Sequence, residues 1–131
     1  MNGPTEAAVG SDFGSWAGRR LDAISAEDPE GVSGWMTDPE ARPHGGESLA
    51  AFAERVGGWL AEQARLDGSA VAITHGGVVK AAVIAALEAP AASFWRVDAS
   101  PLAVTELHAH HGHWTVTRVN AASGAPVEVP V

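Results

Sequence analysis

The chain has 131 residues and no cysteine, and its 8 Lys and Arg against 16 Asp and Glu give a formal net charge of −8. One domain's length, with 46% hydrophobic and 18% charged residues, favours a folded core over disorder, and the missing cysteines exclude a disulfide framework. A single lysine and no basic cluster argue against nucleic acid or an anionic membrane as partner. The longest apolar run is about half of the ~20 residues that a membrane span needs. No signal-peptide pattern opens the chain, so the cytoplasm is the expected location.

The chain divides into an arm at 1–10, one domain at 11–120 and a tail at 121–131. A short helix is expected from Ser15, its N-cap, to the polar stretch that ends at Pro29. A clearer amphipathic helix is expected over 49–63, because apolar residues recur there at helical spacing. Ser48 caps its start and Gly68 lies just past its end.

The next segment predicts a buried strand, a tight turn and a largely buried helix. Ser69–Thr74 is short, apolar and partly β-branched, His75-Gly76-Gly77 forms the turn, and the apolar run Val78–Leu87 is the helix. Pro90 ends this helix, and a short turn or helix is expected at Phe94 and Trp95.

Two strands are expected to close the domain, over Ala103–Leu107 and Trp114–Val119. Gly112 between them favours a hairpin. The alternating tail at 126–131 contains two prolines, which confine it to a sheet edge or leave it loose.

The corner at His75 is the first candidate site. Gly76 and Gly77 allow a tight turn, and their amides at a helix N-terminus favour an anion. His75 would stand at the carboxyl end of a strand, where open α/β sheets place their ligands. An equally open alternative is that His75 only caps the turn.

A second candidate group surrounds the start of the helix at 49–63. Glu47 is a candidate acid or base, and His44 and Ser48 are candidate anion-binding residues, although such residues at a helix start more often act as caps. The hairpin histidines raise the question of a metal, but they straddle an exposed turn without cysteine or paired carboxylates. We therefore predict neither a metal nor a cofactor; these histidines are His108, His110, His111 and His113.

Four stretches of the chain stand out together, and they are Asp12 to Arg19, Pro43 to Leu49, Ile73 to Val78, and Trp114 to Asn120. In this order they resemble the carboxyl-terminal two thirds of the histidine phosphatase (phosphoglycerate-mutase-like) superfamily. The resemblance covers about Ser11 to Asn120, and it implies a three-layer α/β sandwich whose sheet lacks the N-terminal catalytic strand. Trp35 and Asp38-Pro39 are similar to short members in which Trp-x-x-Asp-Pro precedes Gly-Gly-Glu-Ser.

The departures from the family concern the residues of its chemistry. The family's nucleophile is the histidine of an Arg-His-Gly motif, and this sequence contains no Arg-His-Gly. A Ser-Pro-x-x-Arg-Ala segment with a phosphate-binding arginine is also absent, and the usual proton-donor glutamate is replaced by Gly10. Of the core charged groups, the resemblance carries over only the second histidine, as His75. Phosphoryl transfer through a phosphohistidine is therefore not expected.

Three functions remain open from the sequence. The first is a repurposed small-molecule enzyme or binder of a small, anionic ligand, with His75 as its central polar group. The second is a non-catalytic structural or interaction protein, and the third is residual phosphomonoesterase activity with another nucleophile. Without the family's Arg-His-Gly strand, the predicted strand Ser69–Thr74 has an unpaired edge, which favours a homodimer through that edge.

Overall fold

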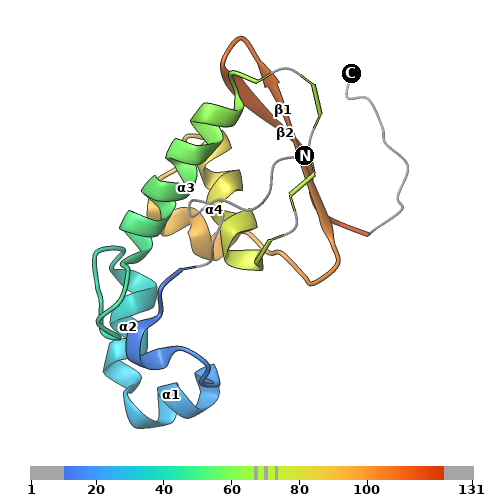
Figure 1. Cartoon of the computed structure of the whole chain (residues 1–131). Helices are drawn as coiled ribbons and strands as arrows, with labels where there is room; N and C mark the ends of the chain where they lie inside the picture. Colours follow the sequence, from blue (N-terminus) through green and yellow to red (C-terminus); the bar gives the residue numbers. More distant parts are fainter. Residues whose placement is uncertain (1–10, 67, 70, 73, 123–131) are drawn as a thin grey trace.

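A computed structural model describes residues 11–66, 68–69, 71–72 and 74–122 of the chain. The predicted arm at 1–10 and the predicted edge strand at 126–131 lie outside the described residues. In Figure 1, α3 and α4 lie side by side, with the β1–β2 hairpin beside their upper part and α1 and α2 at the lower end. The elements are η2 (Gly14–Trp16), α1 (Leu21–Glu27), α2 (Pro29–Thr37), α3 (Leu49–Gln63), α4 (Gly76–Ala86), η3 (Ala91–Arg96), β1 (Val104–His110) and β2 (His113–Ala121).

The first helix does not begin where the sequence predicts. Ser15 lies in the short 3-10 turn η2, and α1 begins at Leu21 after an extended Arg20. The predicted cap at Ser15 is wrong because Ala17 leaves helical geometry with a ψ of 133° and Gly18 has a positive φ of 75°, which interrupts a helix. The chain reaches helical geometry only beyond this turn.

A second short helix, α2, was not expected from the sequence. Its start nevertheless carries two ordinary signals, because the Asp28 side chain accepts a hydrogen bond from the Gly31 amide at 3.0 Å and Pro29 occupies the first turn. The polar stretch before Pro29 therefore ends α1 and begins α2. The two helices hold a small core of their own around Trp16, Ile24 and Val32.

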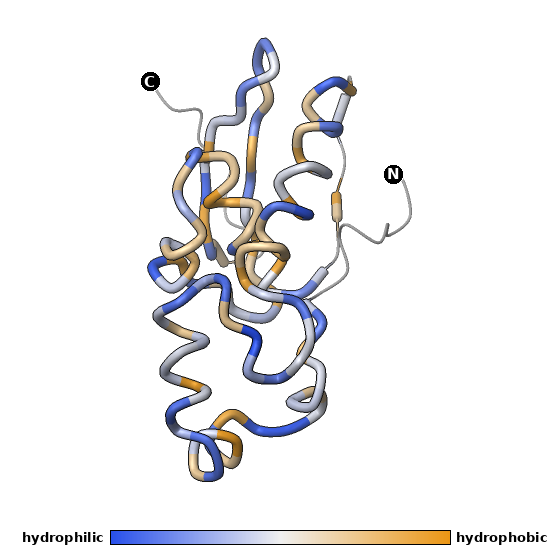
Figure 2. Tube along the Cα trace, turned by 90° about the vertical axis from the view of Figure 1, so that its left-hand side faces the viewer, coloured by the Kyte–Doolittle hydropathy of each residue, from blue (hydrophilic) through white to orange (hydrophobic). Residues whose placement is uncertain are grey.

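Helix α3 confirms the predicted helix and its start at Leu49. It ends at Gln63 with Ala64 as its C-cap, so the prediction that Gly68 lies just past its end is wrong. Ser48 is its N-cap, with its hydroxyl oxygen accepting from the Ala51 amide at 3.1 Å. The apolar stripe of α3 packs against α4 and η3. In Figure 2 the lower part of the tube, which holds α1 and α2, shows blue, white and orange stretches in turn. The buried residues of this main core are Leu49, Phe52, Val56, Leu60, Val78, Ala81, Ala82, Ile84 and Phe94.

The predicted buried strand at Ser69–Thr74 is wrong for the residues described there. Residues 69, 71, 72 and 74 belong to no strand, and the Val71 side chain is 68% exposed. An apolar run becomes a strand only when a neighbouring strand takes up its backbone hydrogen bonds. The described sheet consists of β1 and β2 alone, so this run has no described neighbour.

The hairpin confirms the predicted pair of strands and their turn. β1 and β2 are antiparallel, and His110 faces His113 across a two-residue turn. His111 and Gly112 in that turn both have positive φ, at 50° and 79°, as the favoured hairpin turns require. The Trp114 indole donates to the Leu60 carbonyl at 3.1 Å and so ties the hairpin to α3.

Candidate functional site

His75 is the N-cap residue of α4, and its side chain makes no capping hydrogen bond. The residue is exposed, and its carbonyl accepts from the amides of Val78 and Val79 at 3.0 and 3.2 Å. Gly76 and Gly77 supply the first amides of α4, which have no acceptor inside a helix. The prediction that His75 follows a strand is wrong, because the described residues before it are not in a strand.

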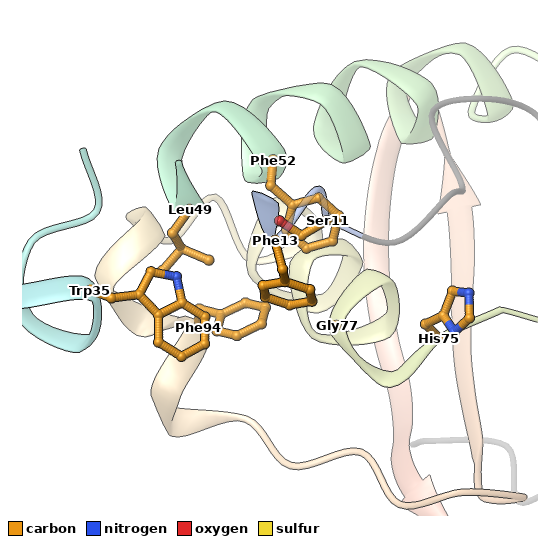
Figure 3. A pocket seen from close by; sticks show the side chains of 8 residues that line it. All are labelled: Ser11, Phe13, Trp35, Leu49, Phe52, His75, Gly77 and Phe94. Carbon is orange, nitrogen blue, oxygen red and sulfur yellow. The ribbon is translucent and has the colours of Figure 1, made fainter. Parts of the chain in front are cut away.

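Two cavities meet at His75. The first, of about 320 Å³, has aromatic walls, and Figure 3 shows its Trp35 end well apart from His75. The second, of about 290 Å³, lies between the start of α4 and the loop before β1, and polar groups of Ser100, Thr105 and Asn120 contribute to it. The first cavity is lined by Ser11, Phe13, Trp35, Leu49, Phe52, His75, Gly77 and Phe94.

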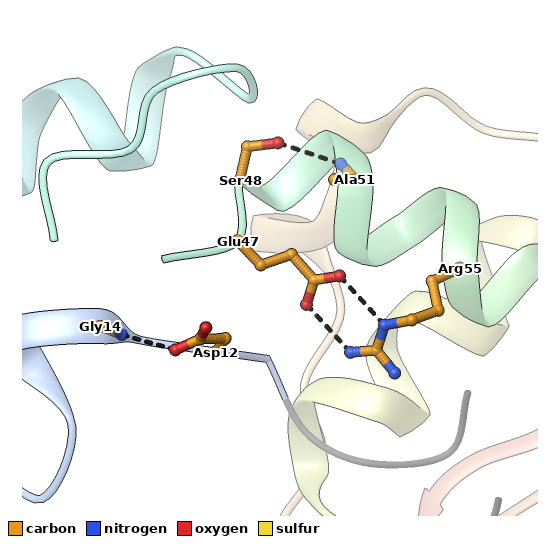
Figure 4. Close-up of polar contacts among 6 residues, drawn as sticks. All are labelled: Asp12, Gly14, Glu47, Ser48, Ala51 and Arg55. Carbon is orange, nitrogen blue, oxygen red and sulfur yellow. Dashed lines mark hydrogen bonds and ion pairs between the residues drawn. The ribbon is translucent and has the colours of Figure 1, made fainter. Parts of the chain in front are cut away.

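Glu47, the predicted acid or base, is held by an arginine. Its two carboxylate oxygens accept from Nε and Nη2 of Arg55 at 3.0 and 2.9 Å, as Figure 4 shows. Ser48 next to it caps α3. Neither Glu47 nor Ser48 lines either cavity at His75, so the structure does not bring them together with His75 there.

His44 is buried in the loop that precedes α3. Its Nδ1 accepts from the Gly46 amide at 2.9 Å, and its Nε2 has no hydrogen-bond partner among the described residues. The imidazole makes edge-to-face contacts with two aromatic rings. Its ring centroid lies 5.2 Å from that of Trp16 and 6.0 Å from that of Phe13. Burial lowers the pKa of His44, against an opposing effect of the Asp12 carboxylate.

The loop that carries these residues is docked on the segment around η2 through its backbone. The Ser15 amide donates to the His44 carbonyl, and the Glu47 amide donates to the Asp12 carbonyl, both at 2.9 Å. The Asp12 carboxylate in turn accepts from the Gly14 amide at 2.9 Å (Figure 4). His44, Glu47 and Ser48 therefore have defined structural contacts in this loop.

One cation near the first cavity was missed by sequence reasoning. The Lys80 ammonium lies 4.8 Å from the centre of the Phe94 ring and 5.7 Å from that of Trp95, and it forms no ion pair with a residue that the structure describes. Its signal in the sequence is a lone lysine inside the apolar run of α4. The cavity walls were also missed, because they come from five separate segments of the chain.

The hairpin histidines lie on the strands and their turn. The His108 Nε2 is 2.9 Å from Glu106 Oε1, and the rings of His110 and His111 lie 4.1 Å apart. Within the described ranges, no group of three or more His, Cys, Asp and Glu residues is placed to hold a metal ion. None of the described helices has the length and apolar character to cross a membrane.

The chemistry open to this arrangement is anion binding next to an apolar cavity. An imidazole N–H and free helix amides are donors, and no carboxylate lines the first cavity. The imidazole is also the group placed to exchange a proton with a bound molecule.

Comparison with known proteins identifies the fold and the family of this chain. The structure of a mycobacterial glucosyl-3-phosphoglycerate phosphatase in complex with inorganic phosphate is similar at a TM-score of 0.77 and 26% identity, over 93% of this chain and 66% of that one. A structure described as mycobacterial hydrolase 2 has a TM-score of 0.75 and 25% identity, over 93% and 60%. The α-ribazole phosphatase of Shigella flexneri, 24% identical over 94% and 63% with a TM-score of 0.75, shows the same fold.

The chain thus spans less than two thirds of the length of these solved relatives. No curated protein matches it. The sequence profile of the histidine phosphatase superfamily (branch 1) matches residues 9–122, which is most of the chain. The fold is that of the phosphoglycerate-mutase-like proteins, and the chain belongs to the histidine phosphatase superfamily.

Proposed function

We propose that this chain binds a small anion of the phosphate class at His75. The observation that carries the proposal is the position of His75, whose ring is free of a capping bond at the start of α4 and lines both cavities. The imidazole and the amides of Gly76 and Gly77 are the donors, and Lys80 adds positive charge near Phe94. A similar mycobacterial phosphatase has been solved with inorganic phosphate, which supports this ligand class.

The proposed activity is binding of the anion without phosphoryl transfer. The 131 residues contain no Arg-His-Gly motif, and a phosphohistidine route needs that nucleophile and its cationic clamps. We therefore propose a repurposed binder or acid–base enzyme in which His75 contacts the ligand, whereas Glu47, His44 and Ser48 hold the loop before α3. The cytoplasm is the proposed location.

A titration of the His75 ring tests the binding. Its NMR signals, assigned with His75→Ala, are followed while inorganic phosphate or methyl phosphate is added. The expected result is a saturable shift at His75 with both anions, and His108→Ala, which changes a ring paired with Glu106, leaves that shift in place. A His75 ring that does not respond to either anion would overturn the proposal.

Turnover is tested with the same protein. We expect release of p-nitrophenol from p-nitrophenyl phosphate at the uncatalysed rate, because the activated nucleophile is absent from these residues. Hydrolysis that His75→Ala abolishes would show that these residues alone carry a phosphatase site, against the non-phosphatase part of the proposal.

We also propose that two copies associate through the side of the molecule near the hairpin. Both strands of the described sheet have an outer edge without a described neighbour, and such edges are seldom left uncovered. Large apolar side chains lie exposed on this hairpin and the segments before it, with Val71 68%, Leu102 92% and Val104 42% exposed. In a symmetric contact, these side chains of both copies would be covered.

A further inference from the structure

We infer that the anion bound at His75 is joined to a flat apolar group, such as an aryl ring system, which occupies the aromatic cavity. The inference rests on the proposed function, because His75 supplies the polar end of the site. The inference adds the chemical class of the group to which the anion is joined. Of the eight residues that line the cavity, Ser11 and His75 have polar side chains and Trp35 carries an indole N–H on an aromatic body, whereas the other five are apolar or glycine.

The walls of the cavity are fixed before any ligand arrives. Trp35 meets the ring of Phe13 edge to face at 6.0 Å, and on other sides it meets Trp16 at 5.6 Å and Trp95 at 4.9 Å. Phe94 likewise meets Phe52 at 6.4 Å. Rings held by several neighbours lose little further freedom on binding, and they favour a flat ligand that stacks or meets them edge to face.

The two ends of the cavity differ in chemistry. In Figure 3, Trp35, Phe13 and Phe94 gather toward one end, and His75 stands apart at the other, beyond Gly77. A ligand that fills the cavity and reaches His75 therefore has an apolar body and a polar head. A polyhydroxylated body would fit poorly, because its hydroxyl groups would lose water and find few hydrogen-bond partners on these mainly aromatic walls.

The charged groups near the cavity do not oppose an anionic head, because no carboxylate lines the cavity. Lys80 lies 4.8 Å from the Phe94 ring centre and Arg55 lies 5.2 Å from that of Phe52, so both rings carry a cation over a face. Glu47 neutralises Arg55, which leaves the Lys80 ammonium as the uncompensated charge of the two. The volume of about 320 Å³ is at the lower end of small-molecule pockets and suits one or two fused rings with a head group.

Two phosphonates that resist hydrolysis separate the two proposals. Methylphosphonate presents the head group alone, and 1-naphthylmethylphosphonate presents the same head group with a flat apolar body. Calorimetric titration of the whole chain is expected to give at least about tenfold tighter binding of the naphthyl compound, because much of its ring surface leaves water. Removing the imidazole in His75→Ala is expected to weaken both.

A substitution that fills the cavity gives the matched test. A Cβ at Gly77 would lie 3.7 Å from Cε2 of Phe52 and 3.9 Å from Cζ of Phe94, so Gly77→Leu places its side chain between these rings. This variant is expected to bring the ratio of the two affinities close to one. In Gly58→Leu, an exposed position of α3 where a Cβ meets nothing within 4 Å, the ratio is expected to stay unchanged.

The outcomes distinguish the proposals. Equal affinities of the two phosphonates, with both weakened by His75→Ala, would overturn the aryl inference and leave anion binding at His75 standing. A naphthyl advantage that survives Gly77→Leu would also overturn the inference, because the ring would then bind elsewhere. Failure of both compounds to bind would overturn the proposed function together with it.

Discussion

Two glycines allow the loop before α3 to lie directly against the segment around η2. A Cβ at Gly46 would collide with the Asp12 carbonyl oxygen, and one at Gly14 with the His44 carbonyl oxygen. Gly14 also has a positive φ of 50°, whereas the φ of Gly46 is not positive. At Gly46 the close approach alone therefore excludes a side chain.

Gly46→Ala is expected to lower the free energy of unfolding by about 1–3 kcal/mol, because two backbone segments must move apart. Urea unfolding measures the effect. Gly34→Ala is the matched control, since its Cβ in α2 would meet nothing within 4 Å. The control should be neutral or more stable by up to about 1 kcal/mol, from its higher helix propensity. If both variants were equally stable, the docked loop would be wrong.

His44 makes the stability of the fold depend on pH. Its pKa in the folded chain lies below the ordinary value of 6.5, because burial disfavours the imidazolium. Below pH 6.5 the unfolded chain binds a proton at His44 before the folded chain does, so the free energy of unfolding falls as the pH falls. The slope from this one group is at most about 1.4 kcal/mol per pH unit.

Urea unfolding at pH 7.5 and 5.5 measures that loss in the natural chain and in His44→Asn. The asparagine carbonyl can accept from the Gly46 amide in place of Nδ1 but does not titrate. We expect a smaller loss in the variant, whatever its stability at pH 7.5. A loss of the same size in both proteins would assign the pH dependence to other groups.

At the scale of elements, the cap of α3 separates a structural role for Ser48 from a role in the ligand site. Ser48→Ala is expected to cost about 1 kcal/mol of unfolding free energy, because the Ala51 amide loses its acceptor. The shift of the His75 ring with inorganic phosphate should keep its midpoint. If Ser48→Ala kept its stability but bound phosphate more weakly, Ser48 would have to be a residue of the anion site.

How well an element could be predicted depended on where its partners lie. Helix α3 and the hairpin carry their signals locally, in an apolar stripe capped by Ser48 and in a turn that needs Gly112. Helix α2 also has local signals at Asp28 and Pro29, but the same residues are equally typical of the end of a preceding helix. The apolar run at Ser69–Thr74 reads as a strand, but its strand pairing depends on a neighbour elsewhere.

The candidate site divides in the same way. His75 and its two glycines stand out as a local motif, so the polar end could be predicted. The aromatic end could not, because Phe13, Trp35 and Phe94 are far apart in sequence and only the packing of η2, α2 and η3 brings them near α3. Residues such as Glu47 stood out by type and motif but proved to have a local partner in Arg55.

At the scale of the whole molecule, the exposed apolar surface leads to a prediction about mass. Leu102 and Val104 belong to the end of the hairpin where β1 begins, and Val71 belongs to the segment before α4. Burying such side chains in a second copy would remove apolar area from water, which is the main favourable contribution to association. Sedimentation equilibrium at micromolar concentration is expected to give twice the 13.4 kDa of one chain.

The contact is tested by placing charge on it. Val71→Lys and Val104→Lys are each expected to shift the mass toward one chain, because two like charges would meet across a symmetric contact. Leu21→Lys in α1 is the control, since this side chain is 50% exposed and Figure 1 places α1 at the opposite end from the hairpin. A dimer that dissociates only with Leu21→Lys would move the contact to α1. A single-chain mass for the natural protein would rule out the dimer. A different partner would then have to cover the exposed apolar surface.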